Sequence, residues 1–335
     1  MRHQTWPVHV PLQEDELLST WLVRVALEHG CDPLVATSNL WPKWRAWTRD
    51  LDRYIDPDKI RVLSECTGIP SSQLTHSSMW SLVELMNSSA KSDSAYWPWL
   101  LPLGSRNRSH RGGLQFCPEC LRRDRYPYFR RLWRIAWMVV CPAHGCLLLE
   151  RCGTCRRPVE PHKVLALDGA IDRCPHCQSP YGALITHQAE DDVLNFQRKC
   201  LDVLSAGKGE IGGEAYSCQQ WFEILRCLVI QREPIMLSTT QTVLARQVTG
   251  LTFELKDHEE RMTRFMHACR AMMAGVEHPA LIRAKKDPKP KRKKIPAKSM
   301  PDQNMGMRSV EGPVPEKIAK ARWALLLRRI GLPME

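Results

Sequence analysis

The chain has 335 residues, 43% of them hydrophobic, so it can build two or three domains with real cores. Lysine and arginine outnumber aspartate and glutamate by 12, a basic balance that predicts an acidic partner such as nucleic acid. No apolar run reaches the length of a membrane span, and the N-terminal residues lack the apolar core of a signal peptide. We therefore expect a cytoplasmic protein whose 14 cysteines are metal ligands or small core residues rather than disulfides.

The first 105 residues predict a helical domain. Apolar side chains recur at helical spacing from Glu14 to His29, and Gly30 ends that helix. Trp41, Trp44 and Trp47 are three residues apart, which predicts a helix face that packs them on the core.

A helix-turn-helix is predicted later in this domain. One short helix covers residues 58–66, a turn follows at Gly68, and a second helix covers residues 72–79, with Ser71 or Ser72 as its N-cap. DNA reading and a purely structural corner are both open interpretations of this motif.

Four ligand pairs, each a CxxC or a CxxH, occupy a 61-residue stretch. Two such pairs complete a tetrahedral zinc site, so two Zn²⁺ ions are predicted. The predicted ligands are Cys117, Cys120, Cys141, His144, Cys152, Cys155, Cys174 and Cys177. Both ions would be structural, because a catalytic zinc keeps one position open for water. A double zinc-finger module with small zinc-ribbon strands is therefore predicted over residues 106–185.

Two pairings of these ligands are open. We call the tight turn of each CxxC or CxxH pair a knuckle. Pairing in sequence order leaves 20 and 18 residues between the two knuckles that share a metal, and the spacing of structural zinc sites favours it. In the cross-brace alternative, which RING domains use, the first pair shares its metal with the third. Cys146 is an alternative ligand that we interpret as a core residue, and His176 is expected to face solvent.

Arginines and aromatic residues alternate between the first two ligand pairs, a composition that suits contacts with a phosphate backbone. Further basic residues precede the module, and the run from Lys285 to Lys298 holds eight lysines and arginines. The predicted nucleic-acid-binding residues are Arg106, Arg108, Arg111, Arg122, Arg123, Arg125, Arg130, Arg131, Lys291, Arg292, Lys293 and Lys294.

The rest of the chain is predicted to be helical. Residues 186–284 form a C-terminal helical region, with helices at residues 219–230, 240–250 and 254–276. Residues 285–312 form a basic disordered linker, because their composition cannot bury a core, and residues 313–335 form a terminal basic amphipathic helix. The predicted fold class is mainly α, with small β elements in the zinc module.

Common enzyme motifs are missing from the sequence. It contains no GxxxxGK[ST] phosphate loop, no HExxH and no HxE followed by PCxxC. These absences favour a binding protein over an enzyme.

The ligand stretch and the first helix together resemble a known family. The segments EDELLSTWLVRVALEHG, FCPECLRRDRYPYFRRLWRIAWMVVCPAHGCLLLERCGTC and RCPHC are similar to the TniQ (TnsD-like) family of bacterial transposition proteins. The resemblance covers about residues 5–185. It implies selection of a transposon's target site, with the eight residues above as zinc ligands and with no catalytic residue.

The resemblance also implies partners. Family members bind DNA at the target, or join a targeting complex that is in some systems an RNA-guided CRISPR effector, and they recruit an AAA+ ATPase regulator. A bacterial, nucleoid-associated location follows, and a homodimer is an open alternative. Two rival functions stay open: a zinc-containing transcription regulator that binds DNA without an ATPase, and a RING-like ligase, which cross-brace pairing would favour.

Overall fold

The computed structural model describes residues 5–87, 97–104, 107–230 and 253–273. Within these ranges the chain is mainly helical, as the sequence predicts, and carries one two-stranded sheet. None of the helices in these ranges is long and apolar enough to cross a membrane. Several predicted features lie outside the described residues: the helices at 240–250 and 313–335, the basic linker, and the side chains of Arg106, Lys291, Arg292, Lys293 and Lys294.

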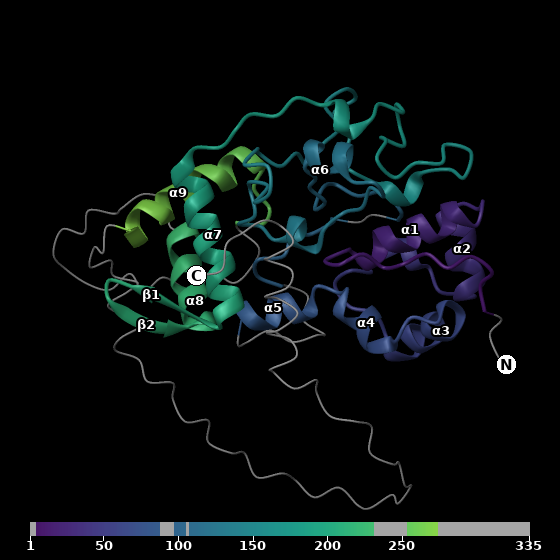
Figure 1. The fold of residues 1–335 in the computed structure, drawn as a ribbon, viewed down its shortest axis with the longest axis horizontal. Helices are drawn as coiled ribbons and strands as arrows, with labels where there is room; N and C mark the ends of the chain where they lie inside the picture. Colours follow the sequence, from purple (N-terminus) through teal and green to yellow (C-terminus); the bar gives the residue numbers. More distant parts are fainter. Residues whose placement is uncertain (1–4, 88–96, 105–106, 231–252, 274–335) are drawn as a thin grey trace, which may run out of the picture.

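The N-terminal part of the molecule is a group of short helices (Figure 1). The first of them, α1 (Leu18–Glu28), is buried along most of its length and carries Trp21 in the core. The elements that follow are α2 (Pro33–Leu40), the 3-10 helix η1 (Ala46–Thr48), α3 (Pro57–Thr67), α4 (Ser71–His76) and α5 (Trp80–Met86).

The helix predicted from the tryptophan spacing is wrong. The chain forms α2 instead, which begins at Pro33, and Trp41 follows its last residue. Trp47 lies in η1, where its indole N–H donates to the Thr37 hydroxyl at 2.9 Å. Trp41 and Trp47 are therefore buried without lying on one helix face, because tertiary hydrogen bonds rather than helical periodicity fix them.

A helix corner is present where the helix-turn-helix was predicted. Gly68 ends α3 with a φ of 72°, a left-handed conformation that suits glycine. The second helix, α4, is shorter than predicted, and its N-cap is Pro70 without a side-chain hydrogen bond, so the predicted serine cap is wrong. DNA reading by α4 stays a prediction.

Short helical turns and coil make up the segment that holds the ligand pairs. They are α6 (Pro118–Arg123) and the 3-10 helices η2 (Arg131–Arg134), η3 (Pro161–Lys163) and η4 (Tyr181–Ala183). The zinc-ribbon strands expected here are reduced, among the described residues, to isolated bridges such as Phe116 with Leu149 and Arg173 with Pro180. The knuckles are held by single bridges because each is too short to extend a ladder.

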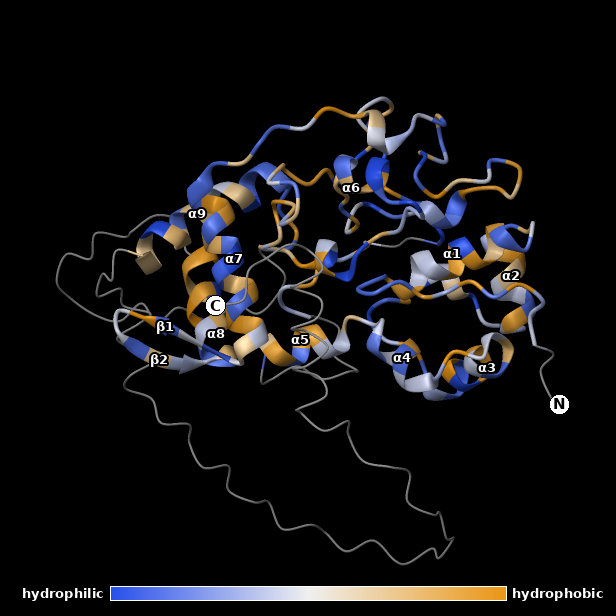
Figure 2. Ribbon diagram, viewed as in Figure 1, coloured by the Kyte–Doolittle hydropathy of each residue, from blue (hydrophilic) through white to orange (hydrophobic). Residues whose placement is uncertain are grey.

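The C-terminal region packs three helices and a hairpin. The elements are α7 (Asp191–Ala206), β1 (Lys208–Ile211), β2 (Glu214–Ser217), α8 (Cys218–Ile230) and α9 (His258–Met273). The strands are antiparallel, with Ile211 opposite Glu214, and Gly212 and Gly213 supply the positive φ angles of the turn between them. Apolar stretches of α7, α8 and α9 stand out in Figure 2.

One hydrophobic core runs from α1 through the ligand segment to α9. Residues 97–104, at the end of the predicted N-terminal domain, belong to this core. Trp97 and Trp99 are buried there, and Leu101 donates its N–H to the Arg134 carbonyl at 2.9 Å. These residues therefore join the N-terminal helices to the ligand segment.

Candidate metal centres and nucleic-acid interface

The first four predicted ligands lie together. His144 Nδ1 is 3.3 Å from the sulfur of Cys120 and 3.5 Å from the sulfurs of Cys117 and Cys141. The sulfurs of Cys120 and Cys141 are 3.6 Å apart. Zinc–sulfur bonds of about 2.3 Å at tetrahedral angles place two sulfurs about 3.8 Å apart, so this group fits a zinc ion.

The second group has the same dimensions. Sulfur–sulfur distances are 3.6 Å between Cys152 and Cys177 and 3.6 Å between Cys155 and Cys174. These four thiols and the first four ligands form two separate groups in sequence order, as the preferred pairing predicts. The cross-brace grouping, and with it the main support for a RING-like ligase, does not match these contacts. That the groups hold zinc stays a prediction.

Three of the knuckles share one local geometry. The residue four positions after the first cysteine has a positive φ and donates its N–H to that cysteine's carbonyl. Gly145, Arg156 and Gln178 occupy this position, with N–H to oxygen distances of 2.8, 2.9 and 2.9 Å. The tight turn brings both ligands of a pair onto one side, which is what a shared metal requires.

The thiols of the second group differ in acidity. Burial raises the pKa of Cys174 to about 12, whereas hydrogen bonding from Ser179 lowers the pKa of Cys177 to about 6. A bound cation would favour the thiolate form of all four, because metal ligands must be deprotonated. Beside the first group, the Cys146 sulfur lies 3.5 Å from that of Cys117 and is fully buried, which agrees with a core residue packed against the ligands.

Two of the predicted nucleic-acid-binding arginines are engaged within the protein, Arg131 fully buried and Arg130 half-buried. Arg131 is 2% exposed and donates to the His76 carbonyl and the Ser81 hydroxyl. Arg130 forms a two-pronged ion pair with Asp124, at 3.0 and 3.1 Å. Both guanidinium groups already have partners in the protein, so neither residue belongs to the candidate interface.

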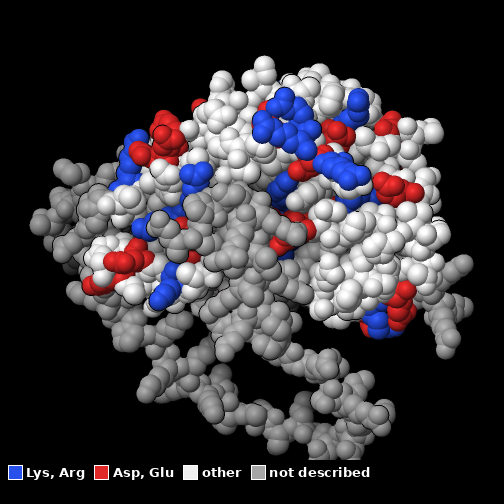
Figure 3. Space-filling view, viewed as in Figure 1, with Lys and Arg blue, Asp and Glu red and all other residues white. Residues whose placement is uncertain are grey.

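The other described arginines of the predicted set are exposed, namely Arg108, Arg111, Arg122, Arg123 and Arg125. Arg122 and Arg123 both pair with Glu119 on α6. Figure 3 shows lysine and arginine side chains gathered over α6 and the neighbouring coil.

A set of exposed arginines, four of which the sequence prediction missed, surrounds the second ligand group. We call it the arginine collar, and it consists of Arg111, Arg151, Arg156, Arg157 and Arg173. All five side chains are exposed, and within the described part of the chain none forms an ion pair with a carboxylate. Arg151 links the set, because it donates to the carbonyls of Arg111 and Arg156 at 3.2 and 3.3 Å. For the four that were missed, the signal in the sequence is their position directly beside the CxxC pairs.

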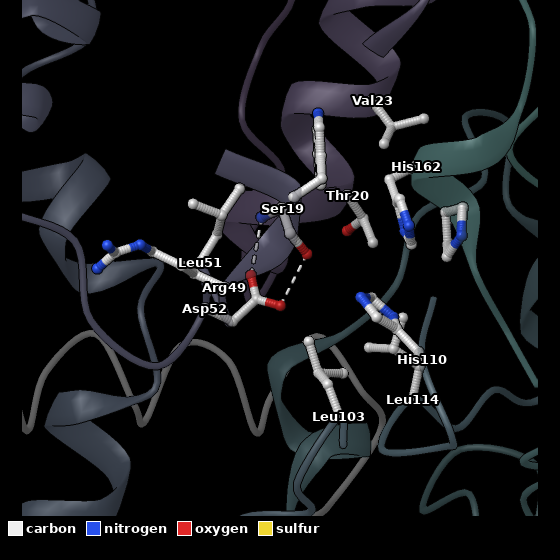
Figure 4. A pocket seen from close by; sticks show the side chains of 12 residues that line it. Ser19, Thr20, Val23, Arg49, Leu51, Asp52, Leu103, His110, Leu114 and His162 are labelled. Atoms are coloured by element: carbon white, nitrogen blue, oxygen red, sulfur yellow. Dashed lines mark hydrogen bonds between the residues drawn. The ribbon is translucent and has the colours of Figure 1, made fainter. Parts of the chain in front are cut away.

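A third polar group lies next to the second set of ligands. His176, which was expected to face solvent, instead donates from Nε2 to Glu160 at 2.8 Å with only 14% of its side chain exposed, so that prediction is wrong. The buried residues His110 and His162 lie close by, at the small pocket between α1 and η3 (Figure 4). Burial lowers the pKa of His110 to about 3, so its imidazole is neutral.

Comparison with known proteins finds a family match for the N-terminal part of the chain. Residues 7–148 match the family model TniQ. The match covers the N-terminal helices and the first ligand group, and it ends before Cys152. No curated protein matches the sequence.

Proposed function

We propose that this chain, which is a member of the TniQ family through residues 7–148, is a non-enzymatic adaptor that selects target sites for a transposon. The TniQ domain makes it a transposition-associated protein, and this is the single observation that carries the proposal. In the proposed role the chain binds DNA or a DNA-targeting complex and recruits an AAA+ transposition regulator.

The arginine collar supports nucleic acid as the partner. Exposed guanidinium groups without carboxylate partners keep their full charge available for phosphate oxygens, which they contact in a two-pronged geometry. Arg156 and Arg157 also sit on a rigid knuckle, because Arg156 N–H is bonded to the Cys152 carbonyl at 2.9 Å. A surface of this kind positions a nucleic-acid backbone without reading its sequence.

Sequence choice would then come from another source. The exposed polar face of α4, with Ser71, Ser72 and Gln73, is one candidate, since short polar side chains on a helix corner can contact base edges. An RNA-guided complex is the other, and the collar would serve guide RNA and target DNA through the same phosphate chemistry.

The two ligand groups fit this role because they would hold the arginine collar in place. Each offers four protein ligands to one ion, so zinc there would be structural and would hold the knuckles that carry the collar. A homodimer would double the surface that contacts phosphates. The molar mass of the chain in solution tests this arrangement.

The proposal is tested by mapping insertions in cells that carry the transposon. Removing the gene for this chain should abolish insertions at the element's normal target while transposase and ATPase levels stay the same. Restoring the wild-type gene should return them. An unchanged insertion map after removal would overturn the proposed function.

A further inference from the structure

Three buried side chains outside the two cysteine groups lie together, and two of them, His110 and His162, line the pocket in Figure 4. They are His110, Glu160 and His162, and their ligand-type atoms all lie within 4.8 Å of one another. Each residue is less than a tenth exposed, at 8%, 3% and 7%. Two imidazoles and a carboxylate are a ligand set that proteins use for zinc.

The His110 imidazole has no hydrogen-bond partner at either nitrogen among the described residues. Leaving a buried polar group unsatisfied costs about 1–3 kcal/mol, so such groups normally have a partner. The ring lies against His162, with centroids 4.4 Å apart, and lines the pocket. One nitrogen of the neutral ring therefore carries a lone pair without a hydrogen-bond donor. It is buried next to two other side chains of the ligand type.

The His162 ring is held as a metal ligand is held. Its Nε2 is 2.7 Å from the Arg108 carbonyl oxygen, which can only accept, so Nε2 carries the proton and Nδ1 keeps a lone pair. A backbone carbonyl that fixes the far nitrogen in this way is the usual support of a metal-bound histidine. Trp47 stacks on the ring at 5.3 Å and fixes its plane.

Glu160 has one acceptor position left. Its Oε1 accepts from the backbone N–H of His110 at 2.6 Å and from Lys163 at 2.9 Å, and its Oε2 accepts from His176 at 2.8 Å. A carboxylate offers about four lone pairs, so one remains on Oε2. Lys163 is the competing cation, but its side chain is 28% exposed and also bonds the Ser109 hydroxyl, so it can turn away.

We propose that His110, Glu160 and His162 form a third metal site, which takes a divalent first-row transition-metal ion such as zinc. A cavity of about 10 Å³ adjoins the two histidines, room for about one water molecule as a fourth ligand. Ligand atoms about 2 Å from a tetrahedral zinc lie about 3.3 Å apart, so the rings must close slightly on the ion. His110 has no side-chain hydrogen bond that opposes this movement.

The site would fasten two parts of the chain and lies against a third. His110 precedes the first ligand group, Glu160 and His162 lie between the two halves of the second group, and Thr20 and Val23 of α1 line the same pocket. A metal ion here would cross-link the ligand segment and fix the His162 ring against which Trp47 of η1 stacks. The inference does not depend on the proposed function.

Zinc content of the full-length chain tests the site. Wild type and His110→Leu are loaded with zinc, freed of weakly bound metal by gel filtration, and analysed by mass spectrometry. We expect His110→Leu to hold one zinc ion fewer per chain, and Lys163→Met to hold its third ion more tightly than wild type. Equal zinc content in wild type and His110→Leu would overturn the site and indicate a buried water instead. If the cysteine groups failed to bind, the difference of one ion would remain.

Two further readouts separate the site from a folding defect. Leucine removes an unpaired buried polar group, which is neutral or stabilising when the third site is empty, so His110→Leu with only its two cysteine groups loaded should melt no lower than wild type loaded in the same way. A third equivalent of zinc should then raise the Tm of wild type more than that of the variant. With cobalt, the third equivalent should add d–d absorption without thiolate-to-cobalt charge transfer, and charge transfer from every equivalent would overturn the assignment.

Discussion

Arg134 and Asp52 form an ion pair at 3.1 Å in which both side chains are closed off from solvent, at 0% and 1% exposed. Arg134 comes from the segment between the first two ligand pairs, and Asp52 follows η1. Asp52 also accepts from the Ser19 N–H at 2.8 Å and from the Ser19 hydroxyl at 2.7 Å. The pair therefore ties α1 to the segment that holds the metal ligands.

Removing this arginine should destabilise the fold strongly. In Arg134→Met the carboxylates of Asp50 and Asp52 lose their shared cation inside the protein, and breaking a buried pair from one side costs about 3–5 kcal/mol. The free energy of unfolding in urea measures the loss. The control is Arg61→Met on α3, whose ion pairs with Asp58 and Glu65 are exposed and should contribute little. Similar losses in both variants would argue against a structural role for Arg134.

Metal content should follow the ligand assignment. Cys152→Ser removes one of four thiolates from the second group, so we expect it to lose one zinc ion and to unfold the surrounding knuckles. Cys31→Ser, outside both groups, should keep the zinc content and stability of wild type. Equal effects of the two substitutions on zinc content would contradict the assignment.

The arginine collar should set the salt dependence of DNA binding. Arg156→Gln combined with Arg157→Gln removes two phosphate contacts, so the slope of log affinity against log salt should fall by about 2. The loss should be the same for unrelated DNA sequences. Lys208→Gln combined with Arg270→Gln makes the same charge change on exposed residues of the C-terminal region and is the matched control. A slope that changes equally in both variants would show that only net charge matters.

Asp15 should make stability depend on pH. Burial raises its pKa to about 6 in the folded protein, from an ordinary value of 3.8. Between these two values the folded state binds more protons than the unfolded state, so the contribution of Asp15 to stability falls as pH rises from about 4 to 6.

In Asp15→Asn this contribution disappears. From pH 4 to pH 6 the free energy of unfolding of wild type should therefore fall by about 2 kcal/mol relative to that of the variant. Denaturant unfolding at several pH values measures the drift. Asparagine is chosen because it tolerates the positive φ of 59° at this position. A constant difference across the range would show that Asp15 is ionised throughout.

The cysteine ligands could be predicted from the sequence because their geometry is local. A CxxC or CxxH turn fixes two ligands within four residues, and the spacing between pairs then limits the groupings. Helices with a strong apolar stripe, such as α8, were predictable for the same reason. The hairpin between β1 and β2 was missed, although Gly212 and Gly213 between short polar strands are a turn signal.

The roles of the arginines could not be predicted, because their partners are remote in the sequence. Arg131 and Arg134 lie in a run that suits phosphate contacts, but Asp15 and Asp52 neutralise them across more than eighty residues. The group of His110 and Glu160 could not be predicted for the same reason, since fifty residues separate these two residues. Tertiary contacts of this kind leave no periodic pattern in the chain.

The most direct measurement is recruitment of the transposon's AAA+ ATPase to target DNA. The ATPase is incubated with a labelled duplex that carries the normal insertion site, together with the guide complex if the element encodes one, in the presence and absence of this chain. A targeting adaptor predicts that the full-length chain increases ATPase retained on that duplex, and that Arg156→Gln with Arg157→Gln reduces the increase. ATPase retention that is the same with and without the chain would contradict target selection by recruitment.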